Sequence, residues 1–135
     1  MTILLSCSKE EEAENVEPVV VFVSMTPTTV SELVNEIVIQ FDYSDGDGNL
    51  GENDAGVTNL FVTDSRNNVV NSFRVQQLAP DNATISIAGS LSITITPLVI
   101  TDGSSSETGT FSIYMNDRAG NKSNVITTTE FTVNK

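Results

Sequence analysis

One stretch of the chain alternates between apolar and small side chains, and this pattern limits the possible folds most strongly. From Thr84 to Ile95 every second residue is apolar except Gly89, and Ser, Thr or Ala stands at the positions between. Side chains on a β-strand point alternately to its two faces, so the pattern predicts a strand with one buried and one solvated face. Gly89 falls on the apolar face, where we expect a bend or a bulge. Such half-buried strands are typical of antiparallel sheets.

Similar but shorter patterns recur along the chain, separated by Gly, Pro, Asn and Asp, and helical periodicity is almost absent. The further expected strands are Val19–Val23, Glu36–Phe41, Asn59–Thr63, Val69–Val75, Thr110–Met115 and Asn124–Val133. The side chains expected to face inward are Ile37, Ile39, Phe41, Phe61, Ile85, Ile87, Leu91, Ile93, Phe111, Ile113, Phe131 and Val133. Short strands with polar outer faces predict an all-β, Ig-like antiparallel β-sandwich of about seven strands.

The N-terminal segment differs in composition from the rest. From Glu10 to Glu17 the chain has five acids and almost no apolar residue, which predicts a disordered, solvated acidic tether. The remaining chain is close to the ~100 residues of one β-sandwich. We therefore expect a tether over residues 1–17 and one Ig-like domain over residues 18–135.

Charge and composition exclude several classes of function. The net charge is −12, from 18 acids against 6 bases, and such a surface repels the phosphate backbone of nucleic acids. No run approaches the ~18 apolar residues that span a bilayer, so membrane attachment is expected only through a lipid. The chain has no histidine, which removes the catalytic triad and the histidine–zinc site. We therefore do not expect an enzyme.

The segment from Asp42 to Asp54 has five acids and no base. Within it, Asp45, Asp47 and Asn49 place oxygen donors at alternate positions, as calcium-binding loops do. The segment is not an EF-hand, because Leu50 and Gly56 stand where that loop needs Gly and Glu. The sequence leaves two interpretations open, a calcium site and a solvated turn without a metal.

The expected topology brings a second polar segment to this loop. In an Ig-like sandwich the loop after the second strand and the loop before the last strand lie at the same end. Calcium prefers six to eight oxygen ligands. The candidate calcium ligands are therefore Asp42, Asp45, Asp47, Asn49, Asp117 and Asn121. The alternative is that Asp117 and Asn121 only hydrogen-bond the backbone of their own turn.

The segment Leu4-Leu5-Ser6-Cys7 resembles the processing site of a bacterial lipoprotein, and the following Ser8–Glu12 resembles the acidic export tag of surface lipoproteins of the Bacteroidota. The resemblance implies a lipid on Cys7 and a location at the outer membrane or cell surface, or facing the periplasm. Only Met1–Ser6 precede Cys7, whereas a secretory signal has a basic region and a longer apolar one. We expect either a signal peptide that starts further upstream or a stub that is not exported. The alternative is an inert cysteine in a frayed terminus.

Two motifs carry a second resemblance. Asp117–Asn121 resembles the Asp-x-Ala-Gly-Asn turn before the closing strand of bacterial Ig-like and cadherin-like or PKD-like domains, and Phe41–Gly51 resembles a recurrent loop of Ig-like lipoproteins in the Bacteroidota. The resemblance implies a non-catalytic structural, adhesive or interaction module. The alternative is an accessory lipoprotein that binds a glycan or a protein ligand. Glycan sites usually use exposed aromatic rings, and this chain offers Tyr43 and Tyr114 but no Trp.

Overall fold

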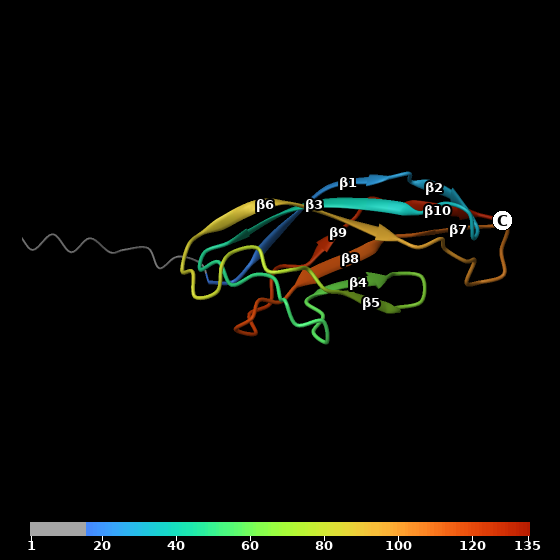
Figure 1. Ribbon diagram of the computed structural model, residues 1–135. Helices are drawn as coiled ribbons and strands as arrows, with labels where there is room; N and C mark the ends of the chain where they lie inside the picture. The colour runs from blue at the N-terminus through green and yellow to red at the C-terminus, as the bar shows by residue number, and fades with distance from the viewer. Residues whose placement is uncertain (1–15) are drawn as a thin grey trace, which may run out of the picture.

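The computed structural model describes residues 16–135, and this part of the chain consists of β-strands and the loops that join them (Figure 1). The predicted all-β class with antiparallel sheets is confirmed. Cys7 and most of the expected tether lie outside the described residues. The strands are β1 (Val19–Thr26), β2 (Thr29–Ser31), β3 (Ile37–Asp45), β4 (Leu60–Asp64), β5 (Val70–Phe73), β6 (Ile87–Ile95), β7 (Ser106–Gly109), β8 (Phe111–Met115), β9 (Ile126–Thr127) and β10 (Phe131–Asn134).

The strands form two facing layers (Figure 1). In one layer β3 lies between β1 and β6 and is antiparallel to both. The other layer has the strand order β5-β4-β8-β9, and a small sheet with the order β2-β10-β7 extends it. Only Thr110 separates β7 from β8, so the β7–β10 and β8–β9 pairs are two halves of one interrupted hairpin. The early strands β1 and β3 thus face β4 and the closing hairpin, as in an Ig-like sandwich.

The closing strand is interrupted where the sequence predicts a continuous one. Instead of a single strand over Asn124–Val133, β9 and β10 pair with different strands. Between them lies Thr128, whose Oγ1 accepts a hydrogen bond from the backbone N–H of Phe111 at 3.0 Å. A side-chain oxygen thus takes the place of a backbone carbonyl, which breaks the regular ladder. The short polar strands β2 and β7 have no apolar alternation and were not predicted.

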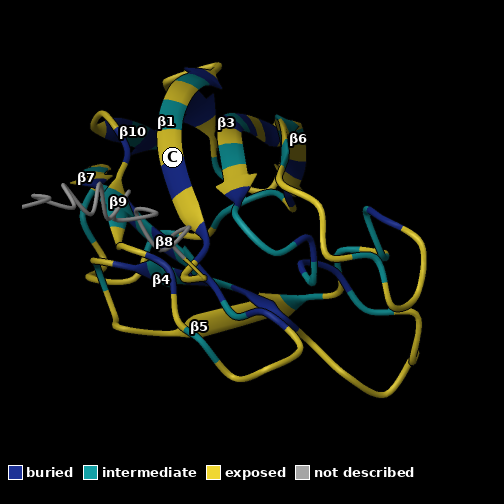
Figure 2. Ribbon diagram, turned by 90° about the vertical axis from the view of Figure 1, so that its left-hand side faces the viewer, coloured by how far each residue is buried: buried dark blue, intermediate teal, exposed yellow. Residues whose placement is uncertain are grey.

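Apolar side chains pack together in the core between the layers. Figure 2 marks the buried positions along the ribbon in dark blue. Most of the residues predicted to face inward are buried, namely Ile37, Ile39, Phe41, Ile93, Phe111, Ile113, Phe131 and Val133, and Ile87 and Leu91 pack against them partly buried. Two predictions are wrong. Ile85 precedes β6 and is 54% exposed. Phe61 lies on the outer face of β4, where its ring stacks on Tyr114 with 4.9 Å between the ring centroids.

Gly89 occupies a regular position in β6 rather than the expected bend or bulge. It stands opposite Tyr43 in an unbroken register with β3. A Cβ atom at Gly89 would lie 2.7 Å from the Tyr43 hydroxyl oxygen, so the glycine makes room for the tyrosine side chain. The register shift in this sheet lies instead in β1, between Phe22 and Ser24.

Residues 16–135 contain no helix, and therefore none with the length and apolar character needed to cross a membrane.

Candidate metal centre

Two loops meet at one end of the sandwich, as the topology predicts. The β3–β4 loop is residues 46–59, and the β8–β9 loop is residues 116–125. The backbone N–H of Asn116 donates to the carbonyl oxygen of Asn59 at 2.9 Å, and the N–H of Arg118 donates to that of Asn49 at 3.2 Å. These bonds bring together two polar segments that are far apart in the sequence.

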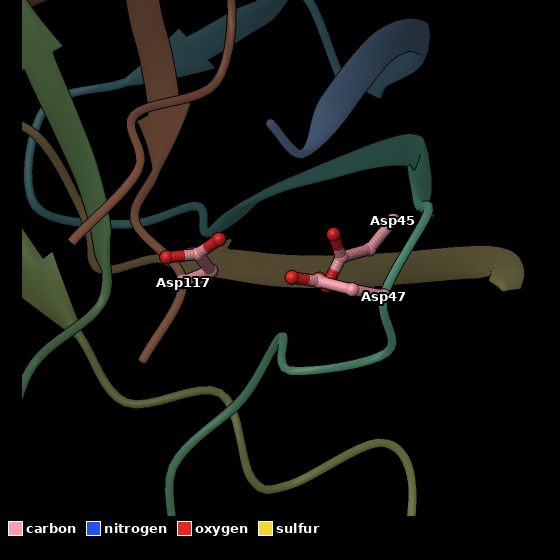
Figure 3. Close-up of side chains that lie close together, drawn as sticks. All are labelled: Asp45, Asp47 and Asp117. Carbon is pink, nitrogen blue, oxygen red and sulfur yellow. The ribbon is translucent and has the colours of Figure 1, made fainter. Parts of the chain in front are cut away.

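Three carboxylates converge between the loops (Figure 3). Asp45, Asp47 and Asp117 each place one oxygen so that the three atoms lie within 4.8 Å of one another. Asp45 is the last residue of β3 and, like Phe41, occupies an inward position of that strand. Asp45 is 1% exposed and Asp117 is 7% exposed. This buried acidic cluster could hold a metal ion.

Four buried oxygens in this cluster accept no hydrogen bond. They are both carboxylate oxygens of Asp45, Oδ1 of Asp47 and Oδ1 of Asn49. No other buried side-chain nitrogen or oxygen within residues 16–135 lacks a partner. A buried polar group without a partner costs about 1–3 kcal/mol, and a charged one costs more. All four atoms are acceptors, and a cation held by the three carboxylates would give those of Asp45 and Asp47 a partner.

The electrostatic environment of Asp45 points the same way. Burial, followed by the charge and the side-chain contact of Asp47 and by the charge of Asp117, raises the pKa of Asp45 from 3.8 to about 6, against a smaller opposing effect of the Leu50 backbone N–H. Within the described residues no Lys or Arg forms an ion pair with these acids. A cation at the centre would reverse the effect on the pKa, because an opposite charge favours the ionised carboxylate.

The loop backbone is shaped to hold these side chains. Gly48 has a φ of 72°, and a Cβ atom there would lie 2.4 Å from the carbonyl oxygen of Ile85. The loop therefore packs tightly against the segment before β6 and needs glycine at this turn. The side-chain Nδ2 of Asn49 donates to Oδ2 of Asp47 at 3.1 Å. This bond fixes the amide, whose oxygen is one of the four atoms without a partner.

Two of the predicted ligands have other roles in the structure. Asn121 donates from its backbone N–H and its Nδ2 to the two carboxylate oxygens of Asp117, at 2.8 and 2.9 Å. Asn121 therefore orients the carboxylate of Asp117, and Asp117 in turn accepts from the backbone of its own turn. Asp42 is exposed on the outer face of β3 and accepts a hydrogen bond from the Ser90 hydroxyl at 2.5 Å. The structure does not bring Asp42 into the cluster.

A residue that sequence reasoning overlooked also joins the loops. Nη1 of Arg118 donates to the carbonyl oxygen of Gly51 at 2.7 Å, in addition to the backbone bond to Asn49. Arg118 occupies the variable position of the Asp-x-Ala-Gly-Asn motif, so nothing in the sequence marked it. A cavity of about 250 Å³ lies beside it, lined by both loops and by Asp117.

The two tyrosines considered for glycan binding contact neighbouring side chains. Tyr43 packs partly buried against the core, with its hydroxyl over Gly89. The ring of Tyr114 stacks on Phe61, and Nζ of Lys122 lies 4.3 Å from its centroid. These contacts give both rings a structural role.

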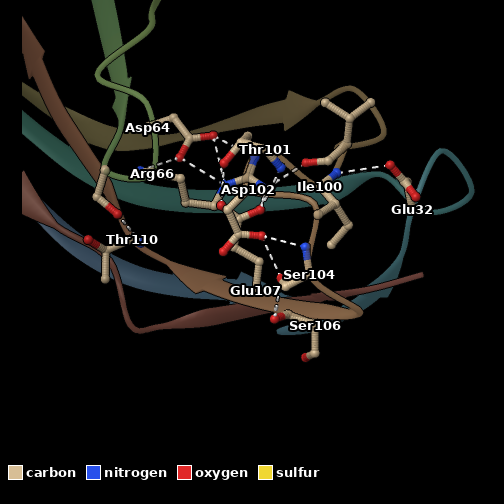
Figure 4. A network of polar contacts seen from close by, with 12 residues as sticks. Glu32, Asp64, Arg66, Ile100, Thr101, Asp102, Ser104, Ser106, Glu107 and Thr110 are labelled. Carbon is tan, nitrogen blue, oxygen red and sulfur yellow. Dashed lines mark hydrogen bonds and ion pairs between the residues drawn. The ribbon is translucent and has the colours of Figure 1, made fainter.

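A second charged cluster lies toward the opposite end of the sandwich and contains an arginine that pairs with its acids (Figure 4). Nη2 of Arg66 lies 2.8 Å from Oδ2 of Asp64, and Nη1 lies 3.3 Å from Oε2 of Glu107. The guanidinium also lies over the ring of Phe131, 5.2 Å from its centroid. Here one base compensates two acids, whereas the acids of the Asp45 cluster have no such base.

Comparison of the chain with protein-family models, with curated proteins and with solved structures found no match. The described residues form a β-sandwich, antiparallel except for the parallel pair β2–β10, with an acidic cluster between two loops at one end.

Proposed function

We propose that this protein is a non-catalytic Ig-like structural or interaction module that works outside the cytoplasm and is stabilised by calcium. The observation that carries the calcium proposal is the state of Asp45. Its carboxylate is 1% exposed, both of its oxygens lack a hydrogen-bond donor, and two further carboxylates face it. A carboxylate in such surroundings needs a cation or a proton to be stable.

The donor atoms favour calcium over other metals. The candidate ligands are oxygens of Asp45, Asp47, Asn49 and Asp117, with no nitrogen or sulfur among them. Such hard oxygen sets suit calcium and magnesium rather than zinc or copper. Magnesium demands a tight octahedral shell and keeps several of its waters, whereas calcium accepts irregular sets of six to eight oxygens. Carboxylates supplied by two loops fit calcium better.

The proposed location agrees with the proposed ion. A lipid on Cys7 would hold the domain at the outer membrane or cell surface, through the acidic tether that follows. Extracellular calcium modules bind the ion weakly, at about 10⁻⁴–10⁻³ M. Such sites fill where calcium reaches about 1 mM, and therefore outside the cell rather than within it.

A catalytic role is not proposed for the cluster. The raised pKa of Asp45 would suit acid–base chemistry, but the side chain is enclosed and a substrate cannot reach it. The cavity beside Asp117 supports a second candidate function, the binding of a small polar ligand such as part of a glycan. Its lining is mostly glycines and polar residues contributed by the β3–β4 and β8–β9 loops.

Calorimetric titration of the full chain with calcium tests the proposal. We expect one ion per chain, bound with a Kd of about 10⁻⁴ M, and weaker binding of magnesium. Asp117→Asn should reduce calcium affinity by about ten-fold or more, because it removes a facing charge. Asp42→Asn is the matched control, since it removes the same charge from an exposed position of β3 outside the cluster. Absence of calcium binding to the wild-type chain would refute the calcium proposal.

A further inference from the structure

Arg118 has a position that charge alone does not explain. Arg118 follows Asp117 directly in the chain. A positively charged residue is therefore adjacent in sequence to a carboxylate of the cluster for which we propose a calcium ion. Like charges at short range repel, and a base here opposes the binding of a cation. A residue with a favourable role at this position must act through its contacts.

Those contacts join the two loops. The backbone N–H of Arg118 donates to the carbonyl oxygen of Asn49, and Nη1 donates to that of Gly51 at 2.7 Å. Both acceptors belong to the β3–β4 loop, and Arg118 belongs to the β8–β9 loop. The two bonds therefore lie across the junction at which Asp117 meets Asp45 and Asp47.

Asp45 is 1% exposed and Asp117 is 7% exposed, whereas Asp47 is half-buried, so an ion held by all three would be largely enclosed by the two loops. The β3–β4 loop is held on its other side by the segment after β5. Leu78 N–H donates to the carbonyl oxygen of Leu50, and a Cβ atom at Gly51 would lie 2.2 Å from the carbonyl oxygen of Gln76. On the side of the β8–β9 loop, the bonds of Arg118 hold the β3–β4 loop in place.

We propose that Arg118 is a positioning residue that holds the β3–β4 loop against the β8–β9 loop and thereby slows the release of calcium. This inference rests on the proposed function, because it concerns the same cation. If the inference is correct, removing the Arg118 side chain speeds calcium release, whereas the loss of its charge alone would slow it. Loss of the guanidinium removes repulsion of the ion, which by charge alone would slow release, but it also removes the side-chain hydrogen bond of Arg118 between the loops.

The test is the rate of calcium release from the full chain, followed by stopped-flow mixing with an excess of a fluorescent calcium chelator. Arg118→Gln should release calcium roughly three- to ten-fold faster than the wild type, the effect of losing one hydrogen bond of ordinary net strength. Arg118→Lys keeps the charge and one donor, so its rate should lie between the two. Lys122→Gln is the matched control. It removes the same charge from the same loop, but its Nζ lies over the Tyr114 ring.

The outcomes separate the two proposals. Faster release by Arg118→Gln, with an unchanged or slower rate for Lys122→Gln, supports the positioning role. Release by Arg118→Gln that is no faster than that of the wild type overturns it while leaving calcium binding intact. A wild-type chain that delivers no calcium to the chelator overturns the calcium proposal itself, and the positioning role with it. If Arg118→Gln does not fold, as judged by circular dichroism, the rate of Arg118→Lys decides, and a wild-type rate there overturns the inference.

Discussion

Calcium should raise the thermal stability of this protein, and neutralising the loop carboxylates should remove that effect. At about 1 mM calcium and a Kd of about 10⁻⁴ M, mass action adds RT ln(1 + 10), or about 1.4 kcal/mol, to the free energy of unfolding. For a domain of this size the melting temperature should rise by roughly 4–8 °C. The double variant Asp45→Asn with Asp47→Asn should melt at the same temperature in calcium and in chelator.

The same double variant should be more stable than the wild type when both are measured in chelator. The pKa of Asp45 is raised from 3.8 to about 6, so ionising it at pH 7 opposes folding by up to about 3 kcal/mol, at 1.36 kcal/mol per unit. Between pH 3.8 and about pH 6, the pKa values of Asp45 in the unfolded and folded states, the folded state binds more protons than the unfolded state. The stability of the calcium-free wild type should therefore rise as the pH falls from 7 toward 5, and the double variant should lack this rise.

Thermal unfolding followed by circular dichroism measures both effects, with Asp42→Asn as the control that keeps the calcium response. Asp42 is exposed on the outer face of β3, so Asp42→Asn removes one negative charge of this segment without changing the cluster. Identical wild-type melting in calcium and in chelator would refute the reasoning. So would a double variant that is less stable than the wild type in chelator, because the cluster would then be stabilising without a cation.

Two further predictions concern the core and the anchor. Phe111 is fully buried and stacks on Phe131 with 4.6 Å between ring centroids. In urea titrations Phe111→Ala should lower the free energy of unfolding by about 3–5 kcal/mol. Phe61→Ala should lower it clearly less, because Phe61 lies on the outer face of β4. A chain expressed behind a signal peptide should fractionate with membranes through a lipid on Cys7, because each buried methylene of the lipid adds about 0.8 kcal/mol. Cys7→Ser should release the protein into the soluble fraction. Cys7→Ser protein that stays bound to membranes would contradict the lipoprotein proposal.

The sequence predicted the strands where the alternation of side chains fixes which face is buried. In β3 the apolar residues Ile37, Ile39 and Phe41 share one parity, and all three are fully buried. In β4 the run Leu60-Phe61-Val62 is apolar throughout, so the sequence of this strand alone does not show which of its residues face the core. The pairing of Val62 with Ile113 of β8 decides the register, and this places Phe61 outside. A neighbouring strand supplies information that a single strand lacks.

The candidate site was predicted in part for the same reason. The alternation of β3 separates Asp42 from Asp45. Asp42 occupies an outward position of the strand, and Asp45 occupies an inward position. Applied to the acids, the alternation would have removed Asp42 from the candidate ligands. The contacts of Arg118 and Asn121 depend on how two distant loops meet, and the local pattern contains no signal for them.

The two charged clusters of this protein explain why a count of acids does not locate a cation site. Glu107 and Asp64 are also acids of low exposure, yet Arg66 reaches both and leaves their need for a counter-charge satisfied. Near the Asp45 cluster, Arg118 donates from its guanidinium to a backbone carbonyl instead. Both carboxylate oxygens of Asp45 and one of Asp47 are left without a hydrogen-bond partner. Unpaired buried acceptors, rather than the number of acids, therefore mark the place where we propose a cation, because a buried carboxylate without a partner needs a counter-charge or a proton.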